Sequence, residues 1–132
     1  MNTKAIDLHQ DISVNLLNFG KSFLTKNRVQ TMKLPDGNEL LNQCDVLRFK
    51  EGGLKIVVGA ICPLIITRKG IEIPKNYWKE FLKHREIYNS LLDQHNFELI
   101  TRGSDLKKVL ETNKKGVILS VEGMYGFGET LR

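Results

Sequence analysis

The stretch that decides the fold is Leu54–Cys62, which reads LKIVVGAIC and is followed by Pro63. It is almost continuously apolar, a pattern typical of a parallel β-strand that is covered on both faces. Proline has no backbone N–H to donate to a sheet, so Pro63 ends the strand. We therefore expect residues 54–62 to form a buried strand of a parallel sheet.

Further strands and helices are predicted on both sides of this stretch. Apolar runs predict strands over residues 4–9 and 116–123 and a short extended segment over residues 97–100. Helical spacing of apolar residues, or a cap before a short run, predicts helices over residues 13–24, 45–51, 76–95 and 104–111. Strands that alternate with helices predict a parallel α/β sheet with right-handed crossovers.

Local signals predict where these elements begin and end. The expected N-caps are Asp11 or Ser13 for the first helix, Asp45 for the second and Ser104 for the last. The polar residues 25–43 are expected to form a long loop, with an optional helical turn at 39–41. The apolar stripe of the long helix consists of Trp78, Phe81, Leu82, Tyr88, Leu91 and Leu92.

Length and composition limit the size of the fold. The 132 residues are 41% hydrophobic and 27% charged, which is the composition of one soluble globular domain. A complete (β/α)8 barrel takes about 250 residues, so this chain is too short for one. We expect residues 1–132 to be a single domain.

Charge and cysteine usage exclude several classes of protein. The formal charge of +5 is spread along the chain, mostly beside acidic residues, so we expect no nucleic-acid partner. Cys44 and Cys62 lack CxxC spacing and are expected to be core residues, not disulfide partners or zinc ligands. No signal peptide or membrane span is predicted, and the expected location is the cytoplasm.

Three side chains fall where parallel α/β folds bind ligands. His9 and Asp11 follow the first strand and Glu122 ends the last, so all three are expected at the carboxyl ends of strands. A carboxylate there is costly to bury unless a cation or hydrogen bonds compensate. Strand alternation places Asp7, His9 and Asp11 on one face. These residues are a candidate metal site, although hydrogen-bonded surface groups are the competing interpretation for a lone His-x-Asp.

A family resemblance supports the metal site. It is found in three segments, residues 5–12 (AIDLHQDI), 47–53 (LRFKEGG) and 118–123 (ILSVEG). In order and spacing these segments resemble the membrane dipeptidase (renal dipeptidase) family, metallopeptidases of the amidohydrolase superfamily. The resemblance covers essentially the whole chain but only the amino-terminal half of the family's domain. It implies a partial TIM (β/α)8-type barrel, about the first three β/α units.

The resemblance also implies an activity. His9 and Asp11 would be first-strand metal ligands, and Glu122 the carboxylate that bridges two zinc ions. A metal-bound hydroxide would hydrolyse a dipeptide amide, with Asp11 and Glu122 in the catalytic site and Asp7 as a supporting group. The family takes further histidine ligands from later strands. We therefore expect this chain alone to hold one zinc ion or none, and to need a complementary carboxy-terminal half or self-association through its open sheet edges.

One alternative remains open, and two further candidate sites are disfavoured. The chain could be a non-catalytic fragment or degenerate relative that acts as a weak metal-binding or interaction module. The glycine-rich segment Gly123–Gly128 could bind a phosphate, but we expect the four residues that follow it in this sequence to be too few for the helix that such a site requires. His84 and His95 lie about 16 Å apart along one helix, so they cannot bind the same ion and are expected to be packed or solvated.

Overall fold

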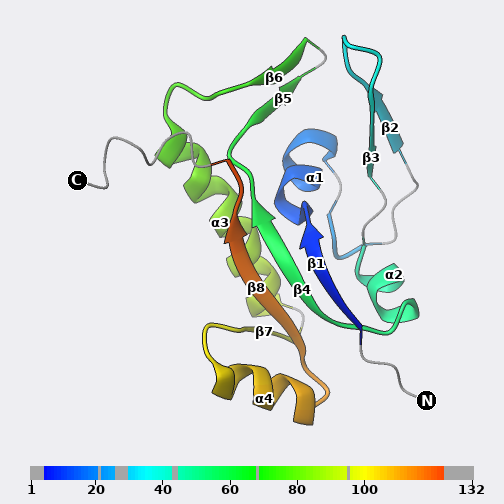
Figure 1. Cartoon of the computed structure of the whole chain (residues 1–132), viewed down its shortest axis with the longest axis vertical. Coiled ribbons are helices and arrows are strands. Elements are labelled where there is room, and N and C mark those ends of the chain that lie inside the picture. Colours follow the sequence, from blue (N-terminus) through cyan, green and yellow to red (C-terminus); the bar gives the residue numbers. More distant parts are fainter. Residues whose placement is uncertain are drawn as a thin grey trace.

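A parallel four-stranded sheet forms the centre of the chain. The computed structural model describes residues 5–20, 22–25, 30–42, 45–67, 69–94 and 96–123. The sheet contains β1 (Ala5–Gln10), β4 (Leu54–Ile61), β8 (Lys115–Val121) and β7 (Phe97–Leu99), in the order β1-β4-β8-β7 (Figure 1). Every neighbouring pair is parallel. The predicted parallel α/β fold is thus confirmed, with Leu54–Ile61 as a central strand.

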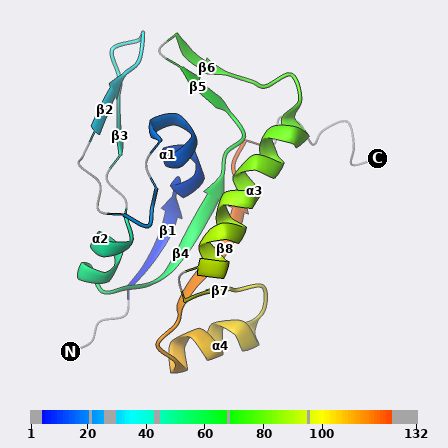
Figure 2. The same ribbon diagram turned by 180° about the vertical axis from the view of Figure 1, so that it is seen from behind.

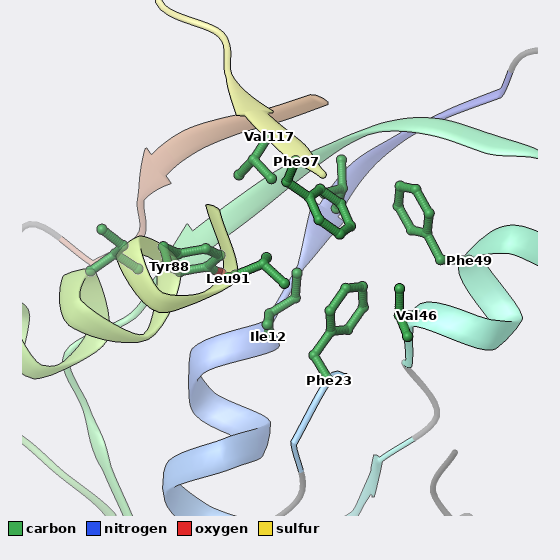
Figure 3. Packing of buried hydrophobic residues seen from close by; sticks show 10 residues of the cluster. Ile12, Phe23, Val46, Phe49, Tyr88, Leu91, Phe97 and Val117 are labelled. Carbon is green, nitrogen blue, oxygen red and sulfur yellow. The ribbon is translucent and has the colours of Figure 1, made fainter. Parts of the chain in front are cut away.

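The helices α1 (Ile12–Phe19), α2 (Val46–Glu51) and α3 (Tyr77–Gln94) enclose the main core with the sheet. Figure 2 shows α3 running along β4 and β8. Figure 3 shows apolar side chains of this core, among them Ile12 and Leu91 from the helices and Val117 from β8. Val57 of β4 belongs to the same cluster. Phe23, Phe49 and Phe97 fill its middle, with ring centroids 5.9–6.1 Å apart.

A smaller cluster covers the opposite face of the sheet. Helix α4 (Gly103–Glu111) buries Val109 against Ile56 and Ile100, with Ile118 beside them. Since Ile56 and Ile118 are the chain neighbours of Val57 and Val117, the two clusters lie on opposite faces. The sheet is therefore covered on both sides at β4, as its continuous apolar sequence predicts.

Gly59 lets α3 approach the sheet closely. A Cβ at this position would lie 2.4 Å from Cε1 of Tyr88, a distance that atoms do not tolerate. Tyr88 is fully buried, and its hydroxyl donates a hydrogen bond of 2.8 Å to the carbonyl oxygen of Ala60. The missing side chain of Gly59 is thus what admits the Tyr88 ring.

Two hairpins replace segments that were expected to be irregular. Strands β2 (Gln30–Lys33) and β3 (Glu39–Asn42) pair in antiparallel fashion, so the helical turn at 39–41 is wrong. The turn between them is closed by Leu34 N–H to Asn38 O at 2.8 Å, which directs the next residues back along β2. Strands β5 (Ile65–Thr67) and β6 (Gly70–Glu72) form a second hairpin in the 64–74 connection.

Two helix ends also differ from expectation. Helix α1 stops at Phe19 because Gly20 adopts a left-handed conformation (φ 62°) and donates to Leu16 O, so the predicted extension to Leu24 is wrong. Helix α4 begins at Gly103, which places Ser104 inside the helix and not at its N-cap.

The long helix buries a different set of side chains from the predicted stripe. Trp78 is 54% exposed and stacks on Phe81, whereas Tyr77 and His84 are buried. The stripe is therefore wrong at Trp78, although Tyr88 and Leu91 are buried as expected. No helix in the described part of the chain is long and apolar enough to cross a bilayer.

Candidate metal centre

Three chain segments bring His9, Asp11 and Glu122 to one point. His9 lies near the end of β1, Asp11 precedes α1, and Glu122 follows β8. The Glu122 N–H donates to Ile61 O on β4 at 2.9 Å, which aligns the end of β8 with the end of β4. The parallel register thus gathers the carboxyl ends of β1, β4 and β8 at one edge of the sheet.

The distances are compatible with one cation. His9 Nε2 lies 3.4 Å from Glu122 Oε2 and 3.7 Å from Asp11 Oδ2. One ligand atom from each of the three residues lies within 4.8 Å of the other two. All three side chains are about half exposed, so a cation can enter from solvent. An imidazole and two carboxylates are a donor set suited to zinc, manganese or iron.

Asp11 does not cap the helix that it precedes. It occupies the N-cap position of α1, and its backbone oxygen accepts from Asn15 N–H at 2.9 Å. Its carboxylate, however, makes no capping hydrogen bond and faces His9 instead. Aspartate at this position ordinarily accepts hydrogen bonds from the first turn. The Asp11 side chain is therefore available to a ligand.

The electrostatics of the cluster favour a cation. Burial raises the pKa of Asp11, and the nearby Glu122 carboxylate raises it further, while His9 opposes both effects. Burial, with Glu122 and Asp11, likewise raises the pKa of the Cys62 thiol to about 11. Within the described ranges, neither carboxylate forms an ion pair with Lys or Arg. A divalent cation would neutralise two carboxylates that otherwise repel each other.

Asp7 supports the backbone of the site. Its Oδ1 accepts from the His9 N–H at 3.1 Å, and its Oδ2 accepts from the Gln10 side chain. Between Asp7 and Gln10 the register of β1 against β4 shifts, so simple alternation does not relate Asp7 to His9. Asp7 thus contacts the main chain of His9, and the imidazole is oriented by the two other carboxylates.

Other candidate residues lie away from the cluster. His84 is completely buried on α3, where its Nδ1 lies 2.8 Å from Ser13 Oγ, so it is a packed histidine. Cys62 is buried, in agreement with its predicted core position. His95, Cys44 and the glycine-rich residues after Gly123 lie outside the described residues.

Tyr77 is a residue whose contribution the sequence does not reveal. Its hydroxyl donates a hydrogen bond to the carbonyl oxygen of Gly123, the residue directly after Glu122. This contact ties the start of α3 to the segment that carries the Glu122 carboxylate. It joins distant parts of the chain, so no local periodicity could have indicated it.

Comparison with known proteins supports the fold. The chain has a parallel α/β fold that matches part of a TIM-barrel-like metallopeptidase. That protein is the crystallised dipeptidase AC, a metallopeptidase of family M19, with a TM-score of 0.63 and 17% sequence identity. The match covers 93% of this chain and 38% of the dipeptidase chain, so the chain spans well under half of its length. Neither a protein-family model nor a curated protein sequence matches the chain.

Proposed function

We propose that this chain is part of a zinc-dependent, dipeptidase-like metallohydrolase and that His9, Asp11 and Glu122 are its metal ligands. The observation that carries the proposal is their convergence, with ligand atoms within 4.8 Å of one another at the carboxyl edge of the sheet. The fold shared with a metallopeptidase supports it. At 17% identity the likeness concerns the fold, so the reaction itself is our proposal.

The chemistry follows from the donor set. Bound zinc lowers the pKa of water and polarises a carbonyl group, which is what hydrolysis of a dipeptide amide requires. His9 and Asp11 would hold one ion from the end of β1. Glu122 has two carboxylate oxygens and is half exposed, so it can face a second ion as well as the first. Asp11 and Glu122 would thereby orient the reacting groups.

The second ion needs ligands from outside the three-residue cluster. We propose that complementary polypeptide supplies them, either a carboxy-terminal half or a second copy of the chain. The sheet offers a place for it: β1 is an edge strand, and its Ile6 and Leu8 side chains are 51% and 75% exposed. Unpaired edge strands with exposed apolar side chains readily add further strands.

Metal binding by purified variants tests the site. Calorimetric titration with Zn²⁺ should show about one equivalent bound, and His9→Ala or Glu122→Gln should weaken binding at least tenfold. Asp36→Asn is the matched control, because Asp36 is an exposed carboxylate in the β2–β3 turn. Wild-type affinity in both site variants would refute the proposed ligand set.

Activity separates the enzyme from its alternative. We expect little dipeptide hydrolysis by the chain alone, and hydrolysis that requires Glu122 once complementary polypeptide is added. The second candidate function, a non-catalytic metal-binding or interaction module, is favoured by the half-exposed ligands and by the exposed Ile6 and Leu8 side chains of β1. Metal binding without hydrolysis in the completed assembly would select that alternative.

A further inference from the structure

The first turn of α1 is held by contacts that do not involve its N-cap side chain. Ser13, in that turn, is completely buried, and its hydroxyl lies 3.3 Å from Ala60 O and 2.8 Å from His84 Nδ1. The Tyr88 hydroxyl donates to the same Ala60 oxygen at 2.8 Å. Helix α1 is thus fastened to β4 and α3 through Ser13, two residues after Asp11.

The hydrogen bonds favour one tautomer of His84. If its Nδ1–H donates to Ser13 Oγ, the serine hydroxyl can donate to Ala60 O, and each of these donors has an acceptor. The imidazole Nε2 is buried without a hydrogen-bond partner among the described residues. An unpaired acceptor is tolerated more readily than an unpaired N–H, so the neutral form with hydrogen on Nδ1 fits this site.

The same part of β4 holds both carboxylate ligands. Ala60 O accepts from Ser13, and the next carbonyl, that of Ile61, accepts from the Glu122 N–H at 2.9 Å. The position of Asp11 relative to Glu122 is therefore fixed through two adjacent β4 carbonyls. On the Asp11 side, His84 contacts the Ser13 hydroxyl and so helps to hold it at Ala60 O.

We propose that His84 is a positioning residue for the candidate metal centre and acts through Ser13 on Asp11. It anchors the Ser13 side chain in the first turn of α1, the turn that Asp11 does not cap, so the Asp11 carboxylate can face His9 and Glu122 while α1 keeps its start. The expected effect of His84 on metal binding rests on the proposed function. The expected effect of His84 on the start of α1 does not depend on it.

Hydrogen exchange on the metal-free protein tests the effect on α1. His84→Ala should speed exchange of the Asn15 amide, which bonds to Asp11 O, at least tenfold relative to amides of β4. His84→Asn places an N–H near the position of Nδ1 and should restore slow exchange, whereas His84→Gln should not. Leu91→Ala, at another buried position on α3, is the control that loses packing in the core but keeps both hydrogen bonds of the Ser13 hydroxyl.

Ser13→Ala guards against misfolding of the histidine variants. It removes the hydrogen bond to His84 and also the one to Ala60 O, with a small change in volume, and should accelerate exchange of the Asn15 amide at least as much as His84→Ala does. If the Asn15 amide exchanges in both variants at the wild-type rate, the inference is overturned. It is also overturned if Leu91→Ala speeds exchange of the Asn15 amide relative to the amides of β4.

The absorption spectrum of bound Co²⁺ tests the effect on the centre. His84→Ala and Ser13→Ala should weaken Co²⁺ binding at least fivefold and alter the spectrum, His84→Asn should recover both, and Leu91→Ala should match the wild type. If the wild-type chain binds no Co²⁺, the proposed function fails and the exchange result alone decides the positioning role. Faster Asn15 exchange with unchanged Co²⁺ binding would overturn the link to the centre.

Discussion

Helices α1 and α2 both begin directly after an aspartate, and they use it in opposite ways. Asp45 is completely buried before α2, where its carboxylate accepts from Leu47 N–H at 3.0 Å and from Arg48 N–H at 2.9 Å. It also pairs with the Arg48 guanidinium. Asp11 makes no such bond and is half exposed beside two other ionisable groups. The first carboxylate stabilises a helix, and the second is left free for a ligand.

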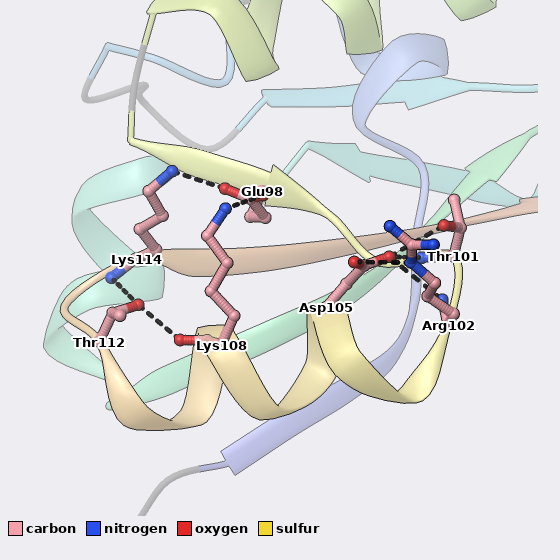
Figure 4. A network of polar contacts seen from close by, with 7 residues as sticks. All are labelled: Glu98, Thr101, Arg102, Asp105, Lys108, Thr112 and Lys114. Atoms are coloured by element: carbon pink, nitrogen blue, oxygen red, sulfur yellow. Dashed lines mark hydrogen bonds and ion pairs between the residues drawn. The ribbon is translucent and has the colours of Figure 1, made fainter.

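The start of α4 gives a third arrangement, shown in Figure 4. Asp105 lies inside the helix and accepts from the backbone N–H groups of Thr101 and Arg102 at 3.0 and 3.2 Å. Nearby, Glu98 accepts from Lys108 and Lys114, each at 2.6 Å. Every carboxylate in this network has a cationic or N–H partner. The contrast shows that Asp11 and Glu122, at the ends of the strands, differ from these acids, because among the described residues they face His9 and pair with no Lys or Arg.

The largest loss of stability is expected for Asp45→Ala. It removes two capping bonds and leaves the Arg48 guanidinium without this partner, so the free energy of unfolding should fall by about 2–3 kcal/mol. Urea denaturation followed by circular dichroism measures the change. A loss below that of Asp105→Ala would break the comparison, because the completely buried Asp45 would then contribute less than the partly exposed Asp105.

The next largest effect is on how the free energy of unfolding depends on pH, a dependence to which His84 contributes. Burial lowers its pKa, Glu80 opposes the shift and Lys83 reinforces it, so the unfolded chain binds this proton more readily. The stability that the neutral His84 contributes is fully present above the pKa of the unfolded chain, about 6.5. It is lost as the pH falls from there toward the lower pKa of the folded protein. The slope is at most about 1.4 kcal/mol per pH unit. Stability curves of His84→Asn should lack this slope, and an equal slope in that variant would contradict the assignment.

Asp105→Ala should have an intermediate effect. The Asp105 side chain is 18% exposed whereas Asp45 is completely buried, so we expect the loss of its bonds to the start of α4 to cost roughly half as much as Asp45→Ala. Thermal unfolding measures the ranking, and Asp105→Asn is the matched variant that keeps an acceptor. If both variants unfold like the wild type, the network of Figure 4 does not stabilise α4.

The smallest effect on stability is expected for Asp11→Ala. Its carboxylate bonds to no helix amide and faces another carboxylate, so the metal-free protein should change by less than about 0.5 kcal/mol. The same variant should lose metal binding. A stability loss as large as that of Asp105→Ala would show that Asp11 caps α1 after all, and would remove the distinction between the two helix starts.

The sequence predicts the central strand and the candidate ligands for a physical reason. Leu54–Ile61 is buried on both faces, so its apolar run is unambiguous, and strand ends locate His9 and Glu122 without tertiary information. Asp11 is different, because an aspartate before a helix has the same pattern whether it caps or binds. Only the geometry separates those two roles.

The hairpins and the long-range hydrogen bonds could not be predicted. Strands β5 and β6 have three residues each, too few for a periodic pattern to emerge. The bonds from Tyr77 to Gly123 and from His84 to Ser13 join residues that are distant in the sequence. Such contacts depend on how the elements pack, so the local propensity of the sequence does not predict them.

The fit of Tyr88 over Gly59 has a consequence for how this protein can vary. Any side chain at position 59 would collide with the ring, and loss of the ring would remove the hydroxyl bonded to Ala60 O. Substitutions at the two positions are therefore constrained to occur together. In an alignment of relatives we expect Gly59 and Tyr88 to covary, a larger residue at 59 appearing only with a smaller one at 88.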